Sequence, residues 1–575
     1  MPQESEPAAG TEDVRAEAVA ALADAPSLNP EQFRRLASYG EREDVAQGDV
    51  LYATGDRRYD LFLIESAVVD VVRDATATDS EYVVYSRHPG DFTGELSMLT
   101  GQSVFLTARV SRPGVVIRIG GERFRAVLRE QVDIADVIVE AFSVRRRIVQ
   151  RAAGSVLEIV GAPHSDQTRA LQAYAARLLL PHEALDADSV PGQALMAAHG
   201  LTAADLPVAV VSDRALRRAA PHDVAAAIGL TYDGSPGSGD SMRAVDLVVV
   251  GAGPAGLAAA VYGASEGLAT VLLDSGGAGG QAATSSRIEN YLGFPRGVSG
   301  EELTRLALVQ ALKFGAQLYA PCDVVALDVG DPRGPAVRLA DGVRLRARSL
   351  IVATGARYRR LSVPRLDEFE KLGHVRYSAT ELDARDCVTR PVTVVGGANS
   401  AGQAALFLAA RGARVDLVVR GEEIRQSMSD YLCRRLEADP KIHLHHRTQV
   451  VGLTGDGALS GVVLAHGDAP GREVPSSAVF CFIGADPDTD WLACLERDPH
   501  GFLLTGTRTS ARTAGPGRPA LPYQTSHPRV FAAGDVRAGS VKRVASAVGE
   551  GAGAVASVHQ MLAQEHDGAL RSLRL

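Results

Sequence analysis

The 575-residue sequence has no long apolar run, no basic excess and no pair of cysteines spaced as C-x-x-C. A membrane-spanning helix needs about 18 consecutive apolar residues, so no span is predicted. Lys and Arg number 60 against 69 Asp and Glu, a net charge of −9, which argues against a nucleic-acid-binding surface. The polar and acidic start is unlike a secretory signal, and we expect a cytoplasmic protein.

Cysteine is scarce, and its arrangement excludes two classes of protein. An odd number of widely spaced thiols argues against a disulfide scaffold and against a cysteine zinc site. We expect reduced thiols, most of them buried as small apolar side chains, and no metal site. The five are Cys322, Cys387, Cys433, Cys481 and Cys494.

The chain is too long for a single hydrophobic core, so two to four domains are expected. Residues 1–25 carry no sustained pattern and are predicted to be a flexible tail. Residues 26–152 begin with short alternating strands separated by turns, which indicates a β-rich domain. A helix follows from about 122 to 151, and we interpret its basic cluster, Arg145-Arg146-Arg147, as a solvated helix face.

Two strands and a helix are predicted within residues 153–231, which we interpret as a small α/β domain. Residues 232–242 are a linker by composition, rich in Gly and Ser. Beyond the linker, strand, glycine turn and helix occur in series twice. This repetition predicts parallel sheets built from βαβ units.

The first glycine turn has the pattern G-x-G-x-x-G and joins an apolar strand to an apolar helix. Such glycines permit a tight turn and a close approach of backbone N–H groups to a pyrophosphate at the helix N-terminus. The following strand ends at Asp274, whose carboxylate can accept the ribose hydroxyls. The pattern predicts a dinucleotide site at Gly251, Gly253, Ala255, Gly256 and Asp274.

The second glycine turn carries Ala398 in place of its middle glycine, and the strand after it ends at Arg420 rather than at an acid. A cation there suits the 2′-phosphate of NADPH, and Arg425 offers a second contact. Two glutamates between these arginines oppose this interpretation, and two ordinary surface arginines remain the alternative. We favour NADPH over NADH, bound near Gly396, Asn399, Ser400, Ala401, Arg420 and Arg425.

Two dinucleotide folds in series, one with an acid and one with a base, imply a flavin paired with a nicotinamide. Several segments resemble thioredoxin reductase-like flavoproteins over residues 245–565: a flavin-contacting segment (279–295), a crossover motif (353–355) and a C-terminal motif (530–551). The resemblance implies that FAD is also bound by Gly280, Gln281, Asn290, Ala353, Thr354, Gly355, Gly534, Asp535, Lys542, Arg543 and Val544.

The resemblance also implies an architecture and an activity. The NADPH-binding domain (366–484) is expected to be inserted between two halves of the FAD-binding domain (243–365 and 485–565). Family members alternate between two domain orientations and are usually homodimers. The expected enzyme is an NADPH-dependent FAD oxidoreductase of α/β fold with two Rossmann-like domains. The cofactors carry the redox chemistry, and no side chain is nominated as acid, base or nucleophile.

One departure from the family concerns electron transfer. Thioredoxin reductases carry a C-x-x-C pair before the second glycine turn; here, 15 to 18 residues before Gly396, the sequence reads Ser-Ala-Thr-Glu (378–381). Without a dithiol, the flavin cannot reduce a disulfide through a thiolate relay, and Cys387 is the only thiol nearby. We expect electrons to pass to an external acceptor: a thioredoxin-like protein, a ferredoxin or flavodoxin, or a small molecule. A thioredoxin-disulfide reductase and a non-catalytic redox or nucleotide sensor remain the alternatives.

The N-terminal domain resembles a cyclic-nucleotide-binding domain, with a phosphate-binding cassette starting at 92. Gly94 and Glu95 fit the cassette, and the resemblance implies that Glu95 accepts a ribose hydroxyl. Aligning Thr107 with the small hydroxyl position places Val104 where the family carries an arginine. A charge-assisted contact worth about 1.5–3 kcal/mol is then missing. We expect the fold, which could regulate the enzyme, without tight cyclic-nucleotide binding; a docking or dimerising domain is the alternative.

The small α/β domain weakly resembles a thioredoxin or glutaredoxin fold. Leu206-Pro207 precedes a strand, as the cis-proline of that fold does. Residues 163–166 occupy the turn where a redox pair would lie but contain no cysteine, and Ser165 is predicted to cap the next helix. We therefore assign no redox chemistry to this domain.

Overall fold

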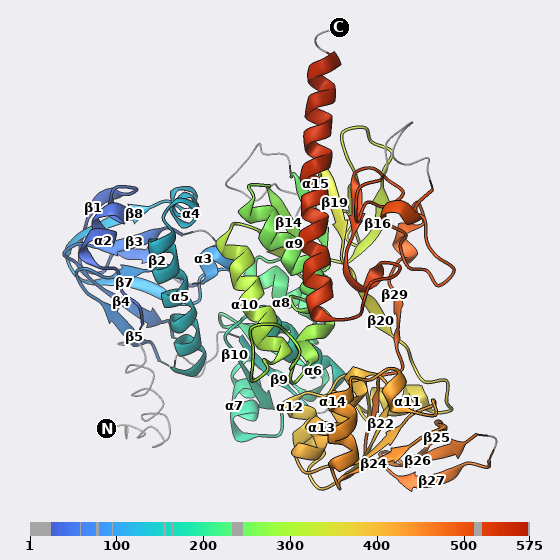
Figure 1. Cartoon of the computed structure of the whole chain (residues 1–575). Helices are drawn as coiled ribbons and strands as arrows, with labels where there is room; N and C mark the ends of the chain where they lie inside the picture. The colour runs from blue at the N-terminus through green and yellow to red at the C-terminus, as the bar shows by residue number, and fades with distance from the viewer. Residues whose placement is uncertain are drawn as a thin grey trace, which may run out of the picture.

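The structure is a computed structural model that describes residues 25–572, apart from 58, 76–79, 95, 153–156, 164, 233–244, 468 and 511–519. The predicted tail (1–25) and linker (232–242) thus lie almost wholly outside the described residues. Figure 1 shows the remaining parts in chain order, from the blue N-terminal sheets to the long red helix α15 (Val544–Ser572). No helix among the described residues is long and apolar enough to cross a bilayer.

The N-terminal domain consists of two four-stranded antiparallel sheets, of strand order β1-β8-β3-β6 and β2-β7-β4-β5. Tyr52, Phe62 and Val110, which come from both sheets, share one buried cluster, so the sheets enclose an apolar interior. The elements are α2 (Pro30–Ala37), β1 (Glu41–Val45), β2 (Val50–Tyr52), β3 (Leu61–Ile64), β4 (Val68–Arg73), β5 (Tyr82–Arg87), β6 (Phe92–Thr93), α3 (Ser97–Thr100), β7 (Thr107–Arg112), β8 (Gly114–Ile119), α4 (Gly121–Glu130) and α5 (Val132–Ala152).

The basic cluster on α5 contradicts the predicted solvated face. Arg145 and Arg146 are only 2% and 3% exposed. The guanidinium of Arg145 lies over the ring of Phe92, and Arg146 donates to the side chain of Gln102 and to the Leu179 carbonyl oxygen. These partners are remote in sequence, so the composition of the helix alone does not show that its arginines are covered.

The small α/β domain has one mixed sheet of order β10-β9-β11-β12, in which β10 is parallel and β11 antiparallel to β9. The Leu206–Pro207 peptide bond, which precedes β11, is cis. Ser165 caps α6 as predicted, accepting from the Thr168 N–H. The elements are β9 (Leu157–Gly161), α6 (Asp166–Arg177), β10 (His182–Asp186), α7 (Val190–Ala198), β11 (Val208–Val211), β12 (Arg214–Leu216) and α8 (Pro221–Ile228).

The first Rossmann-like domain contains a five-stranded parallel sheet of order β15-β14-β13-β19-β30, with a separate antiparallel sheet β16-β17-β18. Its last strand, β30, comes from the far C-terminal part of the chain. The elements are β13 (Leu247–Val250), α9 (Pro254–Ser265), β14 (Thr270–Leu273), α10 (Gly300–Lys313), β15 (Gln317–Tyr319), β16 (Val324–Asp328), β17 (Ala336–Leu339), β18 (Arg344–Arg346), β19 (Ser349–Val352) and β30 (Val530–Ala532).

The second Rossmann-like domain is inserted into the first, because the chain leaves through β20 (Ala356–Tyr358) and returns through its antiparallel partner β29 (Ala485–Pro487). Its parallel sheet has the order β21-β28-β22-β23-β24. The elements are α11 (Leu366–Lys371), β21 (Val375–Arg376), α12 (Glu381–Asp386), β22 (Pro391–Val395), α13 (Asn399–Ala410), β23 (Arg414–Val418), α14 (Asp430–Ala438), β24 (Ile442–His445), β25 (Thr448–Gly455), β26 (Leu459–His466), β27 (Arg472–Pro475) and β28 (Val479–Cys481).

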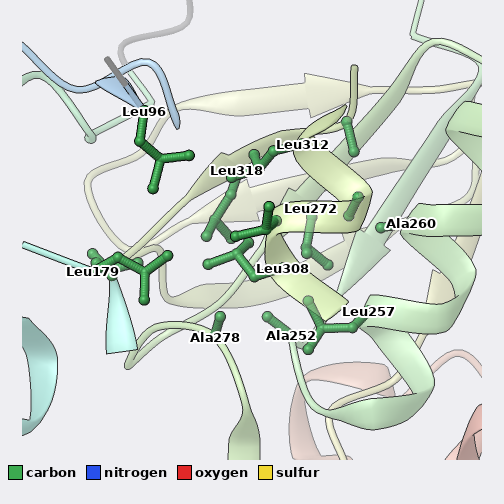
Figure 2. Packing of buried hydrophobic residues seen from close by; sticks show 14 of the residues in the cluster. Leu96, Leu179, Ala252, Leu257, Ala260, Leu272, Ala278, Leu308, Leu312 and Leu318 are labelled. Carbon is green, nitrogen blue, oxygen red and sulfur yellow. The ribbon is translucent and has the colours of Figure 1, made fainter. Parts of the chain in front are cut away.

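One buried cluster joins the N-terminal domain, the small α/β domain and the first Rossmann-like domain. Figure 2 shows Leu96, Leu179 and Leu308, one from each of these parts, in that cluster. Polar contacts reinforce it: the Tyr174 hydroxyl donates to the Ala320 carbonyl oxygen at 2.8 Å. The predicted fold class is confirmed, and the structure adds that these three parts share a core.

Tyr174→Phe should destabilise this junction. The substitution deletes the hydroxyl of a residue that is 2% exposed and leaves the Ala320 carbonyl without that donor, at a cost of about 1 kcal/mol. We expect a lower melting temperature by circular dichroism. Tyr262→Phe, at a side chain that is 44% exposed, is the control. Identical melting curves for the wild type and Y174F would contradict a contribution from this contact.

Candidate functional site

The first glycine turn lies between the carboxyl end of β13 and the N-terminus of α9. Gly251 has a φ of 104°, and a Cβ there would overlap the Ala353 carbonyl oxygen. A Cβ on Gly256 would overlap the carbonyl oxygen of Gly251 itself. Only glycine fits at both positions, so the start of α9 is held directly against the ends of β13 and β19.

Gly253 differs from these two because it borders open space. It is the N-cap of α9, and the nearest atom to a Cβ built on it is Gly280 Cα at 3.9 Å. The first N–H groups of a helix have no intrahelical partner and favour an anion. The turn therefore offers a cradle that a side chain would fill and that fits a pyrophosphate.

Asp274, at the end of β14, holds this turn together. Its carboxylate accepts the Ala252 N–H at 2.7 Å and the Gly276 N–H at 2.8 Å. Burial raises the pKa of this carboxyl, and the two backbone donors oppose that shift. Each oxygen keeps a lone pair, so the predicted bond to a ribose hydroxyl is compatible with these contacts.

The C-terminal motif brings a second carboxylate to the same end of the sheet. Asp535 directly follows Gly534 beyond β30, and no donor among the described residues forms a hydrogen bond with its carboxylate. Burial raises its pKa, while Lys542 nearby lowers it. A partly buried carboxylate without a protein donor fits the predicted contact with a ribityl hydroxyl.

Glu550 is a positioning residue that the sequence interpretation missed. It is 7% exposed and accepts from the Gly534 N–H at 2.7 Å, from Arg537 at 2.7 Å and from Ser540 at 2.8 Å. These bonds fix the loop that carries Asp535. Glu550 lies within the C-terminal motif (530–551), but its partners, 10 to 16 residues away, cannot be identified from spacing.

The remaining predicted flavin residues surround this region. Gln281 donates to the Ala356 carbonyl oxygen, and Thr354 donates to that of Asp488 at 3.3 Å. Lys542 Nζ lies 3.4 Å from the Ala485 carbonyl oxygen, next to β29. Asn290 and Arg543 are exposed, Gly355 lies between β19 and β20, and Val544 begins α15.

The second glycine turn repeats the geometry of the first. Gly396 has a φ of 146°, and a Cβ there would overlap the Phe482 carbonyl oxygen. Ala398 is the N-cap of α13, where Ser400 is exposed and Ala401 is buried. Asn399 accepts the Ser429 N–H at 2.7 Å, which ties the start of this helix to the loop before α14.

The two arginines proposed for a 2′-phosphate differ in their surroundings. Arg425 forms ion pairs with Asp430 at 2.7 Å and with Glu437 at 2.6 Å. Arg420 is exposed, and no described residue forms an ion pair with it. Glu422, one of the acids that opposed the interpretation, pairs with Arg447. Arg420 is thus the arginine whose charge is uncompensated.

The cysteine-free stretch before the second turn lies against the first domain. Ala379 forms a parallel bridge with Ser285, which lies within the flavin-contacting segment, and Tyr377 stacks on Tyr358 with ring centres 6.1 Å apart. None of the cysteines is an activated thiol: four are buried, and burial raises the pKa of Cys387 and Cys481 to about 11.

The cassette of the N-terminal domain is filled by its own side chains. Thr107 donates to Asp74 at 2.7 Å, and Val104 lies in the apolar cluster between the sheets. A Cβ on Gly94 would lie 2.9 Å from the sulfur of Met98. Glu95, the predicted ribose ligand, lies outside the described residues.

Two Rossmann-like sheets, one inserted into the other, with two glycine turns and a C-terminal acid, define a class of two-dinucleotide oxidoreductases. Residues 245–551, more than half of the chain, match the family of pyridine nucleotide-disulphide oxidoreductases, and residues 42–131 match the cyclic nucleotide-binding domain. The chain belongs to the pyridine nucleotide-disulphide oxidoreductases and carries an N-terminal cyclic nucleotide-binding domain.

Relatives of known name agree with this family. NADPH-dependent thioredoxin reductase 3 of Arabidopsis thaliana is 32% identical over 338 residues, 57% of this chain and 60% of the relative. The thioredoxin reductase of Chlamydia trachomatis is 31% identical over 328 residues, 56% of this chain and 99% of the relative. The thioredoxin reductase of Lactococcus lactis has 26% identity and a TM-score of 0.49, covering 56% of this chain and 99% of that one.

The chain is thus a thioredoxin reductase-like enzyme whose cofactors are FAD and NADPH. The open cradle at Gly253 and the unbonded carboxylate of Asp535 fit a flavin dinucleotide. The exposed cation at Arg420 fits a 2′-phosphate.

Gly551→Ala should weaken FAD binding. A Cβ there would overlap the Ala255 carbonyl oxygen and push α15 away from α9, which carries the first glycine turn. Overpacking of this kind costs about 1–3 kcal/mol. We expect purified G551A to retain less FAD, measured as the ratio of flavin absorbance at about 450 nm to protein absorbance at about 280 nm. Gly549→Ala, where a Cβ meets nothing within 4 Å, is the matched control. Equal FAD content in both variants would contradict the role of this contact.

Proposed function

We propose that this enzyme transfers electrons from NADPH through FAD to an acceptor outside the chain, without an internal dithiol. The observation that carries the proposal is the position of the Ser-Ala-Thr stretch (378–380). It pairs with the flavin-contacting segment through Ala379 and Ser285, where a relay to the flavin would act, and it contains no thiol.

The chemistry of the remaining cysteines supports the same proposal. The thiolate is the reactive form of a thiol, and burial raises the pKa of Cys322, Cys387 and Cys481 to about 11. Cys494 is exposed, but partial burial of its thiol raises its pKa as well. No thiol of this chain is therefore suited to exchange with a disulfide near neutral pH.

The protein's part in the reaction is binding and orientation. FAD, when bound, supplies the hydride acceptor and the store of electrons. Gly253 and the N-terminus of α9 would bind its pyrophosphate, Asp274 and Asp535 would accept sugar and ribityl hydroxyls, and Glu550 fixes the Asp535 loop. Gly396 and the start of α13 would bind the pyrophosphate of NADPH.

The predicted site residues and domain limits are part of this proposal. FAD would lie on 243–365 and 485–565, and NADPH on 366–484. The N-terminal domain would regulate the enzyme through α3, which contacts α10, because α10 in turn contacts the flavin-contacting segment. We also propose a homodimer in the cytoplasm, as the sequence resemblance implies.

Arg420→Gln should impair the use of NADPH. A charge-assisted contact worth about 1.5–3 kcal/mol would be lost, which corresponds to a KM for NADPH about 10- to 100-fold higher at an unchanged kcat. Arg425→Gln is the control, because Arg425 already pairs with Asp430 and Glu437. The measurement is ferricyanide reduction at varied NADPH and NADH. An equal rise in KM for both nucleotides would contradict recognition of the 2′-phosphate.

A thioredoxin-disulfide reductase is the second candidate, favoured by the names of the relatives. Anaerobic NADPH should bleach the flavin band, and successive addition of thioredoxin, ferredoxin, flavodoxin and ferricyanide should show which acceptor restores it. Reduction of one thioredoxin disulfide, with formation of two thiols, for each NADPH oxidised would overturn direct transfer to another acceptor. A flavin that NADPH does not bleach would point instead to a sensor.

Cys387→Ser and Cys481→Ser should leave turnover with ferricyanide within about twofold of the wild type, because neither buried thiol would take part in electron transfer. Stopped-flow rates of flavin reduction should likewise be unchanged. A loss of flavin reoxidation in C387S with normal flavin reduction would contradict the proposal and indicate a thiol in the electron path.

A further inference from the structure

Two buried arginines lie beside the cassette of the N-terminal domain. Arg87, the last residue of β5, is 8% exposed, and Arg145, on α5, is 2% exposed. Arginine is rarely buried to this degree unless its charge is paired. Neither residue was singled out as functional by the sequence, and neither belongs to the redox site.

Both guanidinium groups have N–H donors without an acceptor. Arg145 donates one hydrogen bond, from Nη1 to the Gly94 carbonyl oxygen at 3.2 Å, and its Nε has no partner. Nε and Nη2 of Arg87 have none either. No carboxylate within the part of the chain that the structure describes forms an ion pair with either residue. At least three buried donors are thus unsatisfied.

The positive charges of Arg87 and Arg145 also repel each other. Burial and the charge of Arg87 together lower the pKa of Arg145 to about 9, while Tyr85, Tyr52 and Asp91 act in the opposite direction. Asp91 is already bonded to the His88 N–H at 3.0 Å. Aromatic rings stabilise the cations only in part: Arg145 Cζ lies 4.1 Å from the centre of the Phe92 ring, and Arg87 Cζ lies 4.6 Å from that of Tyr85.

An anion would satisfy these groups. Paired guanidinium N–H groups match the oxygen atoms of a phosphate better than they match a spherical ion. Charge-assisted hydrogen bonds of this kind are stronger than those between neutral groups. The cassette positions of the resemblance do not provide this chemistry, because Thr107 is bonded to Asp74 and Val104 is apolar. The unsatisfied charge lies instead on β5 and on the helix that follows the sheets.

We propose that Arg87 and Arg145 together form a binding site for a tetrahedral oxyanion of the phosphate class. The anion is either inorganic phosphate or the phosphate group of a small nucleotide. It would bridge β5 and α5 and lie next to Gly94 at the start of the cassette. The site is independent of the proposed redox function, since no residue of the flavin or nicotinamide site takes part.

The test uses the full-length, FAD-loaded enzyme in a phosphate-free buffer at constant ionic strength. Thermal shift and isothermal titration calorimetry are carried out with inorganic phosphate, cyclic AMP and 5′-AMP, and with chloride as a non-tetrahedral comparison. The variants are Arg87→Met and Arg145→Met, which remove the charge but keep much of the volume. Arg42→Gln, which changes an exposed arginine paired with Glu65 on the same domain, is the control.

We expect saturable binding of at least one phosphate compound, affinity reduced at least tenfold in R87M and in R145M, and wild-type affinity in R42Q. Binding of inorganic phosphate would identify a free anion, and binding of the nucleotides alone would identify a nucleotide-borne phosphate. Because unpaired buried charge destabilises, both methionine variants should melt no lower than the wild type without ligand.

Two results would overturn the proposal. One is a shift in melting temperature that does not saturate with ligand concentration and is equal for phosphate and chloride in every variant. The other is nucleotide binding that R87M and R145M leave unchanged, which would place the phosphate elsewhere in the domain. Flavin reduction by NADPH, measured on the same samples, should be unaffected, so failure of this site is distinguishable from failure of the redox function.

Discussion

The close approach of three distant backbone segments to the first turn of α9 is the constraint on which the flavin domain depends. The segments after β19 and β30 and the N-terminal part of α15 each contact this turn where a Cβ would not fit, at Gly251, Gly534 and Gly551. Gly551 and Ala255, whose backbones meet here, are 296 residues apart in sequence. The chain must therefore leave for the inserted second Rossmann-like domain and return from it without moving these contacts, which the antiparallel pair β20 and β29 allows.

Local patterns were sufficient to predict much of this arrangement. Strand β14 ends directly before Asp274 and β22 directly before Gly396, where strand ends are predicted, because a short apolar run followed by an acid or a glycine has few alternatives. The positions that require glycine were identified for the same reason. The hydrogen bonds of the acidic residues were not identified from the sequence. Asp274 accepts from the Ala252 N–H, 22 residues earlier, and Glu550 accepts from the Gly534 N–H, and spacing gives no information on either pair.

Burial of charge was the property that the sequence predicted least well. The cluster on α5 has the composition of an exposed helix face, yet Arg145 is covered by Phe92 and Arg146 by residues of two domains. Whether a charged side chain is solvated depends on what packs over it, and here that is decided by the junction of three domains. In contrast, Arg420 and Arg425, which were both predicted to contact the 2′-phosphate, are distinguished by the two ion pairs of Arg425.

The same junction gives the N-terminal domain a physical connection to the flavin site. Helix α3 of the cassette contacts α10, and Arg146 donates to Ser97 at the start of α3. Helix α10 begins at Gly300, where a Cβ would overlap the Ala282 carbonyl oxygen, so the start of α10 packs directly against the segment 279–295. Because close-packed elements shift as units, a displacement of α3 would either break this packing or move that segment.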